Sequence, residues 1–192
     1  MNKRQLLVCT ASAALLAATG GCTTTHPTAG AESPTTKRHA LDADSDAALA
    51  RLYAQVPGSR ELVAKSKGTL VMPTVISAGL GVGGSYGEGE LRAGHKGVGY
   101  YKLVGASVGL IAGAQSRAIF LLFMTQDALE RFESSKGWTA GVDASVAVAT
   151  IGANGQSDVK TLQQPVIGFV LTNVGLMANL TLEGARFIKT EA

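Results

Sequence analysis

The chain has 192 residues, of which 46% are hydrophobic and 16% charged, and 17 Lys and Arg residues stand against 14 Asp and Glu residues. Two of the basic residues lie in an N-terminal segment that we expect to be removed, which leaves 15 (17 minus 2) against 14 and a net charge of +1. A charge this small, without a clustered basic face, gives no support for nucleic-acid binding. Both cysteines, Cys9 and Cys22, lie near the N-terminus, so the rest of the chain offers no disulfide and no thiol chemistry.

Residues 1–21 are predicted to form a secretion signal. Two basic residues precede an apolar run from Leu6 to Ala18, and the small residues Thr19-Gly20-Gly21 stand directly before Cys22. The apolar run is too short for a membrane-spanning helix of the mature protein. The site resembles the cleavage site of bacterial lipoproteins, although Thr19 stands where leucine is usual. We therefore expect lipidation at Cys22; the alternative is an ordinary signal peptide with an incidental cysteine.

Residues 22–40 are expected to form a lipidated, disordered tether, because they are rich in Thr, Pro and Ala and show no apolar period. Residues 41–192 then form one domain, large enough for a core of its own.

Two helices are predicted at the start of this domain. The first is capped by Ser45 and ends at Pro57-Gly58. Its apolar stripe consists of Leu49, Leu52, Tyr53 and Val56. The second starts at Ser59 and ends at Gly68, with Leu62 and Val63 directed inward.

The centre of the chain is rich in glycine. Glycines recur at odd-numbered positions from Gly79 to Gly89 and from Gly97 to Gly113. Alternate residues of a strand share one face, so these runs predict strands with a face almost bare of side chains. Glycine within strands is typical of strong curvature, bulges or the close approach of another backbone. We therefore predict a sharply curved sheet or small barrel.

Alternation and β-branched content predict further strands at residues 118–124, 138–151, 166–172, 175–182 and 187–190. A helix capped by Thr125, with Leu129 and Phe132 inward, is expected after the first of these, and Asn154-Gly155 predicts a tight turn. The fold class is therefore α+β: a curved, mostly antiparallel, glycine-rich sheet with about three helices packed on it.

Two glycine motifs match sequences of catalytic or nucleotide sites but lack the expected surroundings. Gly79 to Gly84 matches GxGxxG, yet the glycine-rich residues that follow cannot start the helix that would hold a pyrophosphate. Gly105 to Gly109 matches GxSxG around Ser107, yet its neighbours predict continuous strand, and His95 is the one histidine after residue 40. We predict no enzymatic activity and no cofactor.

Metal binding is not predicted either, because one histidine and no cysteine within residues 41–192 leave only carboxylates, and these are not spaced as a calcium loop. Asp143 is expected to be a hydrogen-bonded strand or turn carboxylate, in preference to a ligand.

A series of short motifs runs through the domain. They are Lys67-Gly68, the run from Gly79 to Gly89, Gly137-Trp138, Gly141-Val142-Asp143-Ala144-Ser145, Gly175-Leu176-Met177-Ala178 and Leu182-Glu183-Gly184. In this order they resemble the SYLF domain family, over about Leu41 to Lys189. The resemblance implies a lipid-binding domain without enzymatic activity. Eukaryotic relatives bind phosphoinositides and some associate with actin, whereas bacterial relatives include secreted lipoproteins.

The signal sequence and the family resemblance together predict a lipid-binding lipoprotein. We expect it to be anchored in the outer membrane and to face the periplasm, because Thr23, and not aspartate, follows the cysteine. An exported protein does not meet actin, and the acidic start of the first helix differs from the eukaryotic pattern, so neither actin binding nor phosphoinositide specificity is expected. Candidate contacts to phospholipid headgroups border the glycine-rich strands: Lys65, Lys67, Arg92, Lys96 and Lys102. The alternative is a structural envelope protein that binds a protein partner or itself.

Overall fold

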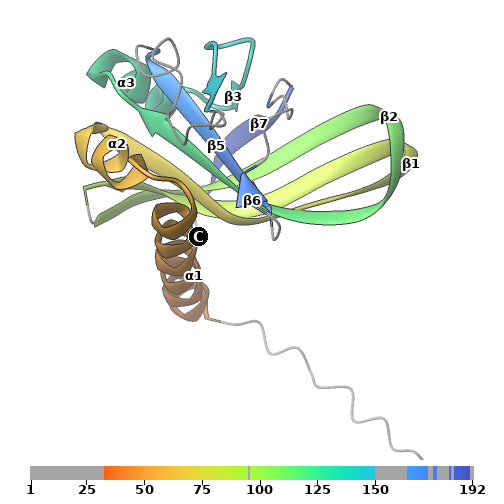
Figure 1. The fold of residues 1–192 in the computed structure, drawn as a ribbon, viewed down its shortest axis with the longest axis horizontal. Helices are drawn as coiled ribbons and strands as arrows, with labels where there is room; N and C mark the ends of the chain where they lie inside the picture. The colour runs from red at the N-terminus through yellow and green to blue at the C-terminus, as the bar shows by residue number, and fades with distance from the viewer. Residues whose placement is uncertain are drawn as a thin grey trace, which may run out of the picture. The chain divides into compact units, whose positions relative to one another are not determined.

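The computed structural model describes residues 33–94, 96–149, 164–172, 175–176, 182 and 184–190, all within the unit Ser33–Ala192. The predicted signal, Cys22, His95 and the Asn154-Gly155 turn lie outside the described residues. In chain order, the described elements are α1 (Pro34–Gln55), α2 (Ser59–Lys65), β1 (Gly68–Ala93), β2 (Lys96–Phe123), α3 (Gln126–Ser134), β3 (Trp138–Thr139), β4 (Ala147–Val148), β5 (Val166–Thr172), β6 (Gly175–Leu176) and β7 (Arg186–Thr190) (Figure 1).

The sheet is built on one long antiparallel hairpin. β1 and β2 pair from Gly68 with Phe123 to Ala93 with Lys96. β5 adds to one end of β2 and β7 to the other, both antiparallel, while the short β4 runs parallel to β5. Within the described part of the chain this gives a seven-stranded, mostly antiparallel sheet that curls strongly (Figure 1). The predicted α+β class with a curved sheet is confirmed.

The hairpin doubles back on itself where glycine allows it. A Cβ atom at Gly87 would lie 2.8 Å from the carbonyl oxygen of Thr74, and one at Gly89 would overlap the carbonyl oxygen of Val71 and the Met72 sulfur. Both neighbours belong to β1 itself, so this strand crosses over its own earlier part at a distance that only glycine permits. The predicted close approach of backbone is confirmed at these two glycines.

Each face of the sheet contributes to a buried core. On one face, α3 covers a core that contains Leu70, Met72, Val75, Leu91, Tyr101, Leu103, Ile119, Leu121, Phe123, Leu129, Phe132, Trp138 and Phe187. On the other, α1 and α2 cover Val71, Phe120, Leu122, Ile167 and Phe169 with Ala48, Leu49, Leu52 and Val56. Alternate residues of β2 thus point into different cores, as the two-residue period of a strand requires.

Several local predictions are confirmed. The Thr125 hydroxyl accepts a hydrogen bond from the Ala128 N–H at 3.3 Å and caps α3, and Leu129 and Phe132 are buried. β5 coincides with the predicted strand, β7 begins one residue early, and α2 starts at Ser59 as expected. Each of these elements is marked by neighbouring residues in the sequence, and its packing in the fold favours the same structure.

The predicted start of the first helix is wrong. α1 begins at Pro34, so residues 34–40 are helical, and Ser45 is a buried residue inside the helix instead of its cap. Proline suits the first helical position because it has no N–H to leave unpaired. The first turns make no apolar stripe, so the sequence pattern detects only the part of the helix that packs.

The predicted strand at residues 118–124 is confirmed up to Phe123, as the end of the longer strand β2. The predicted strand at residues 138–151 is wrong, because the described residues 138–149 hold only the two short strands β3 and β4. A turn separates them, in which the Asp143 carboxylate accepts the Thr139 N–H at 2.6 Å and Gly141 has a φ of 82°. Asp143 is thus the turn carboxylate that was predicted. Of the predicted strand at residues 175–182, the described part is β6.

Gly89→Ala should lower the free energy of unfolding by about 1–3 kcal/mol, because the new methyl group would overlap the backbone of β1. Gly84→Ala is the matched control: its Cβ would meet only the Gly105 carbonyl oxygen at 3.7 Å, so stability should stay unchanged or rise slightly. Urea titration followed by circular dichroism measures both. Equal stability of the two variants would contradict the crossing.

Candidate functional site

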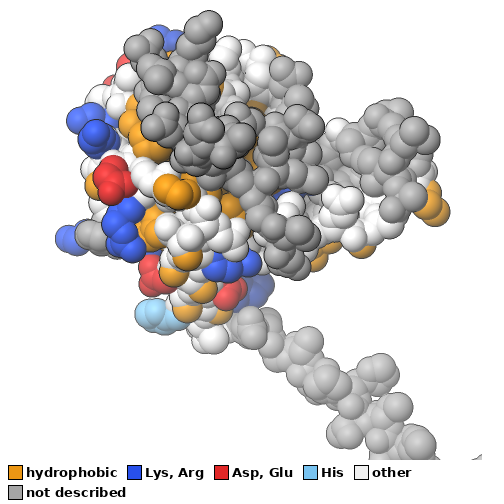
Figure 2. All heavy atoms as spheres, in the orientation of Figure 1, with side chains coloured by type: hydrophobic (Ala, Val, Ile, Leu, Met, Phe, Trp, Pro, Cys, Tyr) orange, Lys and Arg blue, Asp and Glu red, His pale blue; other side chains and the backbone are white. Residues whose placement is uncertain are grey.

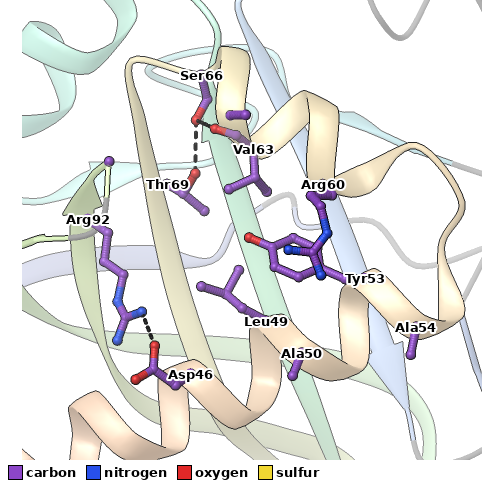
Figure 3. A pocket seen from close by; sticks show the side chains of 12 residues that line it. Asp46, Leu49, Ala50, Tyr53, Ala54, Arg60, Val63, Ser66, Thr69 and Arg92 are labelled. Carbon is purple, nitrogen blue, oxygen red and sulfur yellow. Dashed lines mark hydrogen bonds and ion pairs between the residues drawn. The ribbon is translucent and has the colours of Figure 1, made fainter.

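A cavity of about 670 Å³ lies between α1, α2 and the two ends of β1 (Figure 3). Its lining comprises Asp46, Leu49, Ala50, Tyr53 and Ala54 of α1, Arg60, Val63 and Ala64 of α2, and Ser66, Thr69, Arg92 and Gly94. Its size suits a small molecule or the polar end of a lipid.

The corner between α1 and α2 shapes this cavity. Gly58 has a φ of 78°, a left-handed conformation that glycine adopts readily. The Ser59 hydroxyl lies 2.6 Å from the Val56 carbonyl oxygen and donates a hydrogen bond to it. Leu52 and Val56 are buried against the sheet. The corner therefore holds α2 at an angle to α1, and the residues between the two helices remain open.

One wall of the cavity is apolar and carries a single exposed cation. The Arg60 guanidinium lies over the Tyr53 ring, 4.4 Å from its centroid (Figure 3). Burial raises the pKa of Tyr53, and the charge of Arg60 acts in the opposite direction. Among the described residues no carboxylate pairs with Arg60. Its N–H donors, held in place by the ring, are therefore available to an anion.

At the other end of the cavity, a charge cluster ties α1 to the hairpin. Arg92 contacts the Glu90 and Asp46 carboxylates, each at 2.5 Å, and donates to the Asp42 carbonyl oxygen at 3.0 Å. Tyr100 of β2 donates to the Asp42 carboxylate at 3.2 Å. We call Asp42, Asp46, Glu90, Arg92 and Tyr100 the charge cluster.

The contacts within the cluster act against the effect of burial on its charged groups. Glu90 is 1% exposed, and burial raises its pKa while the hydrogen bond and charge of Arg92 oppose that rise. Burial alone would lower the pKa of Arg92, but its bonds to Asp46 and Glu90 outweigh this effect and raise the pKa. Arg92 is therefore already occupied by two carboxylates.

The predicted headgroup contacts are not gathered at this cavity. Lys65 and Lys67 are exposed at the end of α2 and just after it, and Lys96 is exposed at the start of β2. Lys102 is half-buried in β2, opposite Glu88 of β1.

Of the five, Arg92 alone lines the cavity. Sequence reasoning missed Arg60, because the cavity wall it completes depends on the corner at Gly58. The sequence did offer one sign of this cavity: Tyr53 is an aromatic residue with a polar hydroxyl in an otherwise aliphatic stripe.

Both glycine motifs lie in paired strands. Gly83 faces Ser107, and Ser85 faces Gly105, across the β1 and β2 ladder. Neither segment leads into a helix, so neither has the geometry of a phosphate-binding turn or a nucleophile elbow. The described residues also contain no group of three His, Cys, Asp or Glu side chains placed to hold a metal ion. No helix in the described part is long and apolar enough to cross a membrane.

Residues 104–192 match the family Ysc84, "Las17-binding protein actin regulator", which is the SYLF family. This segment belongs to the SYLF family. The match begins within β2 and extends past β7, whereas every residue that lines the cavity precedes the matched segment. The predicted SYLF resemblance is confirmed over these residues. No curated protein matches the chain.

Arg92→Gln should lower the free energy of unfolding by about 3–5 kcal/mol, because it leaves Glu90 buried without a partner. The double variant Arg92→Gln with Glu90→Gln should lose less free energy of unfolding than Arg92→Gln alone, because no buried charge is left without a partner. Thermal and urea unfolding measure these differences. Since the raised pKa of Glu90 favours the protonated carboxyl in the folded state, the Arg92→Gln variant should regain stability as the pH falls toward the ordinary range of a glutamic acid.

The control for this cycle is Arg131→Gln. Arg131 pairs with Asp127 at 3.2 Å, but both side chains are over 70% exposed (73% and 72%), so the loss should stay below about 1 kcal/mol. A loss of equal size in the Arg92→Gln and Arg131→Gln variants would show that the charge cluster does not fix α1.

Proposed function

We propose that this protein is a non-enzymatic, lipid-binding lipoprotein of the bacterial envelope, and that the cavity between α1 and α2 holds the headgroup end of an anionic phospholipid. The observation that carries the proposal is the pairing of an apolar wall with the Arg60 guanidinium, which has no carboxylate partner among the described residues. A ligand that satisfies both features has an anionic group attached to apolar chains.

The chemistry of each part supports this assignment. A guanidinium presents a planar set of donors that matches two oxygens of a phosphate. The walls of Leu49, Tyr53 and Val63 offer contact to glycerol and the first methylene groups of an acyl chain, each worth about 0.8 kcal/mol when buried. Asp46 also lines the cavity, but its charge is balanced by Arg92. The exposed Lys65, on the same helix as Arg60, adds a cation outside the cavity.

The remaining parts of the proposal rest on the sequence. Acyl chains at Cys22 would anchor the protein to the periplasmic face of the outer membrane, with phospholipid as its partner. The description of the SYLF family names an actin regulator, but an exported protein does not meet actin, so we do not extend that role to this chain. The absence of enzymatic activity is supported by the strand geometry of both glycine motifs.

Arg60→Gln should weaken binding of a short-chain phosphatidylglycerol, used as a monomer in solution, by at least about tenfold, because a charge-assisted hydrogen bond is lost. Arg51→Gln is the matched control, since Arg51 is exposed on α1 and does not line the cavity; its affinity should stay within about twofold of the parent. Isothermal titration calorimetry gives both dissociation constants. If the two variants bind equally well, Arg60 does not hold the headgroup.

Cys22→Ser should release the protein from membranes or block its processing, because the acyl chains supply the apolar surface for stable attachment. Membrane fractionation and the intact mass of the mature protein measure this. Unchanged fractionation together with an unchanged mature mass would contradict the anchor.

A further inference from the structure

The part of the hairpin that doubles back stands apart from the rest of the sheet. We call residues 76–87 of β1 and 103–116 of β2 the arch. β5 pairs with β2 at residues 118–123 and β7 at residues 100–104, so in the described part of the chain residues 105–108 and 112–116 pair with β1 alone. Figure 1 shows these two strands running out from the other elements and curving back together (Figure 1).

The outer face of the arch is apolar and exposed. Within the arch, the described side chains at even-numbered positions of β1 are exposed: Leu80 is 83% and Val82 67% exposed, and Ile76 and Tyr86 are also exposed. At odd-numbered positions Ser77 is buried and Ser85 half-buried. In Figure 2, hydrophobic side chains lie along the rim of the lobe at the right that these strands form (Figure 2).

The arch carries no charge. Neither residues 76–87 nor residues 103–116 include Asp, Glu, Lys, Arg or His. Exposed apolar side chains on a surface without charges mark a site of contact with a membrane or a partner. Charged residues resume at the base of both strands, with Glu88 opposite Lys102 on one side and Arg117 on the other.

The base of the arch suits the level of lipid headgroups. Tyr86 donates to the Glu88 carboxylate at 2.6 Å, and tyrosine favours the boundary between hydrocarbon and water. Arg117 is half-buried, its Nε atom has no hydrogen-bond partner in the described structure, and its terminal nitrogen lies 3.5 Å from the Ser85 hydroxyl. No carboxylate among the described residues pairs with it. Because the Nε atom is buried, a phosphate oxygen would be bound through the terminal guanidinium nitrogens.

We propose that the arch is a membrane-inserting element: Leu80 and Val82 enter the acyl-chain layer of a phospholipid bilayer, while Tyr86 and Arg117 remain at the headgroup level. A bilayer is favoured over a protein partner because charged residues stand at both bases of the uncharged span, and the exposed Tyr86 stands at one of them, as at a membrane boundary. The free backbone edges of a two-stranded ribbon cannot enter hydrocarbon without cost. Insertion is therefore shallow, with the side chains in the acyl layer and the backbone among the headgroups.

This inference rests on the proposed lipid association but uses a different surface, so a bilayer tests it separately from the monomeric lipid. The protein is the expected mature form, residues 22–192 with Cys22→Ser, which contains the whole Ser33–Ala192 unit and no other cysteine. Leu80→Cys places a fluorophore sensitive to polarity on the arch, and Val142→Cys places it on an equally exposed residue (79%) in the turn after β3. The vesicles contain phosphatidylethanolamine and phosphatidylglycerol.

The label at residue 80 should shift to the blue on vesicle addition and be quenched by nitroxides on the acyl chains, and the label at residue 142 should do neither. Leu80→Asp should weaken vesicle binding at least about tenfold, because a charge cannot enter the acyl layer, whereas Val142→Asp should not. Neither aspartate variant should change the affinity for monomeric phosphatidylglycerol.

Three other results would overturn the proposal in distinguishable ways. Vesicle binding with a label at residue 80 that stays in water would leave lipid binding intact and reject the arch. A dimer of the parent chain that Leu80→Asp dissociates, without insertion, would assign the arch to self-association. Absence of binding to both vesicles and monomeric lipid would reject the proposed function as well.

Discussion

The crossing of β1 over its own earlier part is the constraint on which the rest of this structure depends. It brings Gly87 and Gly89 against the backbone around Val71 to Thr74, and it closes the hairpin into a curl. Residues from the two ends of the hairpin, such as Leu70 and Tyr101, then share one core. The same crossing forces the middle of the hairpin outward, where no further strand of the described structure covers it. The shared core and the exposed arch therefore both result from the contact of β1 with its own earlier part.

The charge cluster determines how α1 sits on this curl. The apolar core between α1 and the sheet would by itself allow the helix several positions, because apolar contact is not directional. Arg92 of β1 restricts this freedom, since it binds Asp46 of α1 and is held in position by Glu90 of its own strand. Burying Glu90 has a cost that its partner must offset. The position of the α1 wall of the cavity thus depends on Arg92. Arg92 itself is not available to a ligand, because two carboxylates already bind its guanidinium.

Elements marked by local signals could be predicted from the sequence, and elements set by distant contacts could not. The Thr125 cap and the β5 strand are specified by neighbouring residues, and glycine at alternate positions correctly indicated curvature. The start of α1 was missed because its first turns touch nothing that imposes an apolar period. The break between β3 and β4 depends on the turn at Asp143. Arg60 was missed for the same kind of reason, since a cavity between two helices exists only after both have packed.

The unequal pairing of β2 gives one continuous strand two mechanical behaviours. Its ends are bonded on both sides, by β1 with β7 and by β1 with β5, whereas its middle is bonded on one side. Regions with fewer bonds and fewer buried contacts open at lower free energy. The middle can therefore change its curvature while both ends stay fixed in the sheet. A force on the arch would therefore bend the middle of β2 first. Because the paired ends of β2 contribute residues to both cores, the same force would reach both cores.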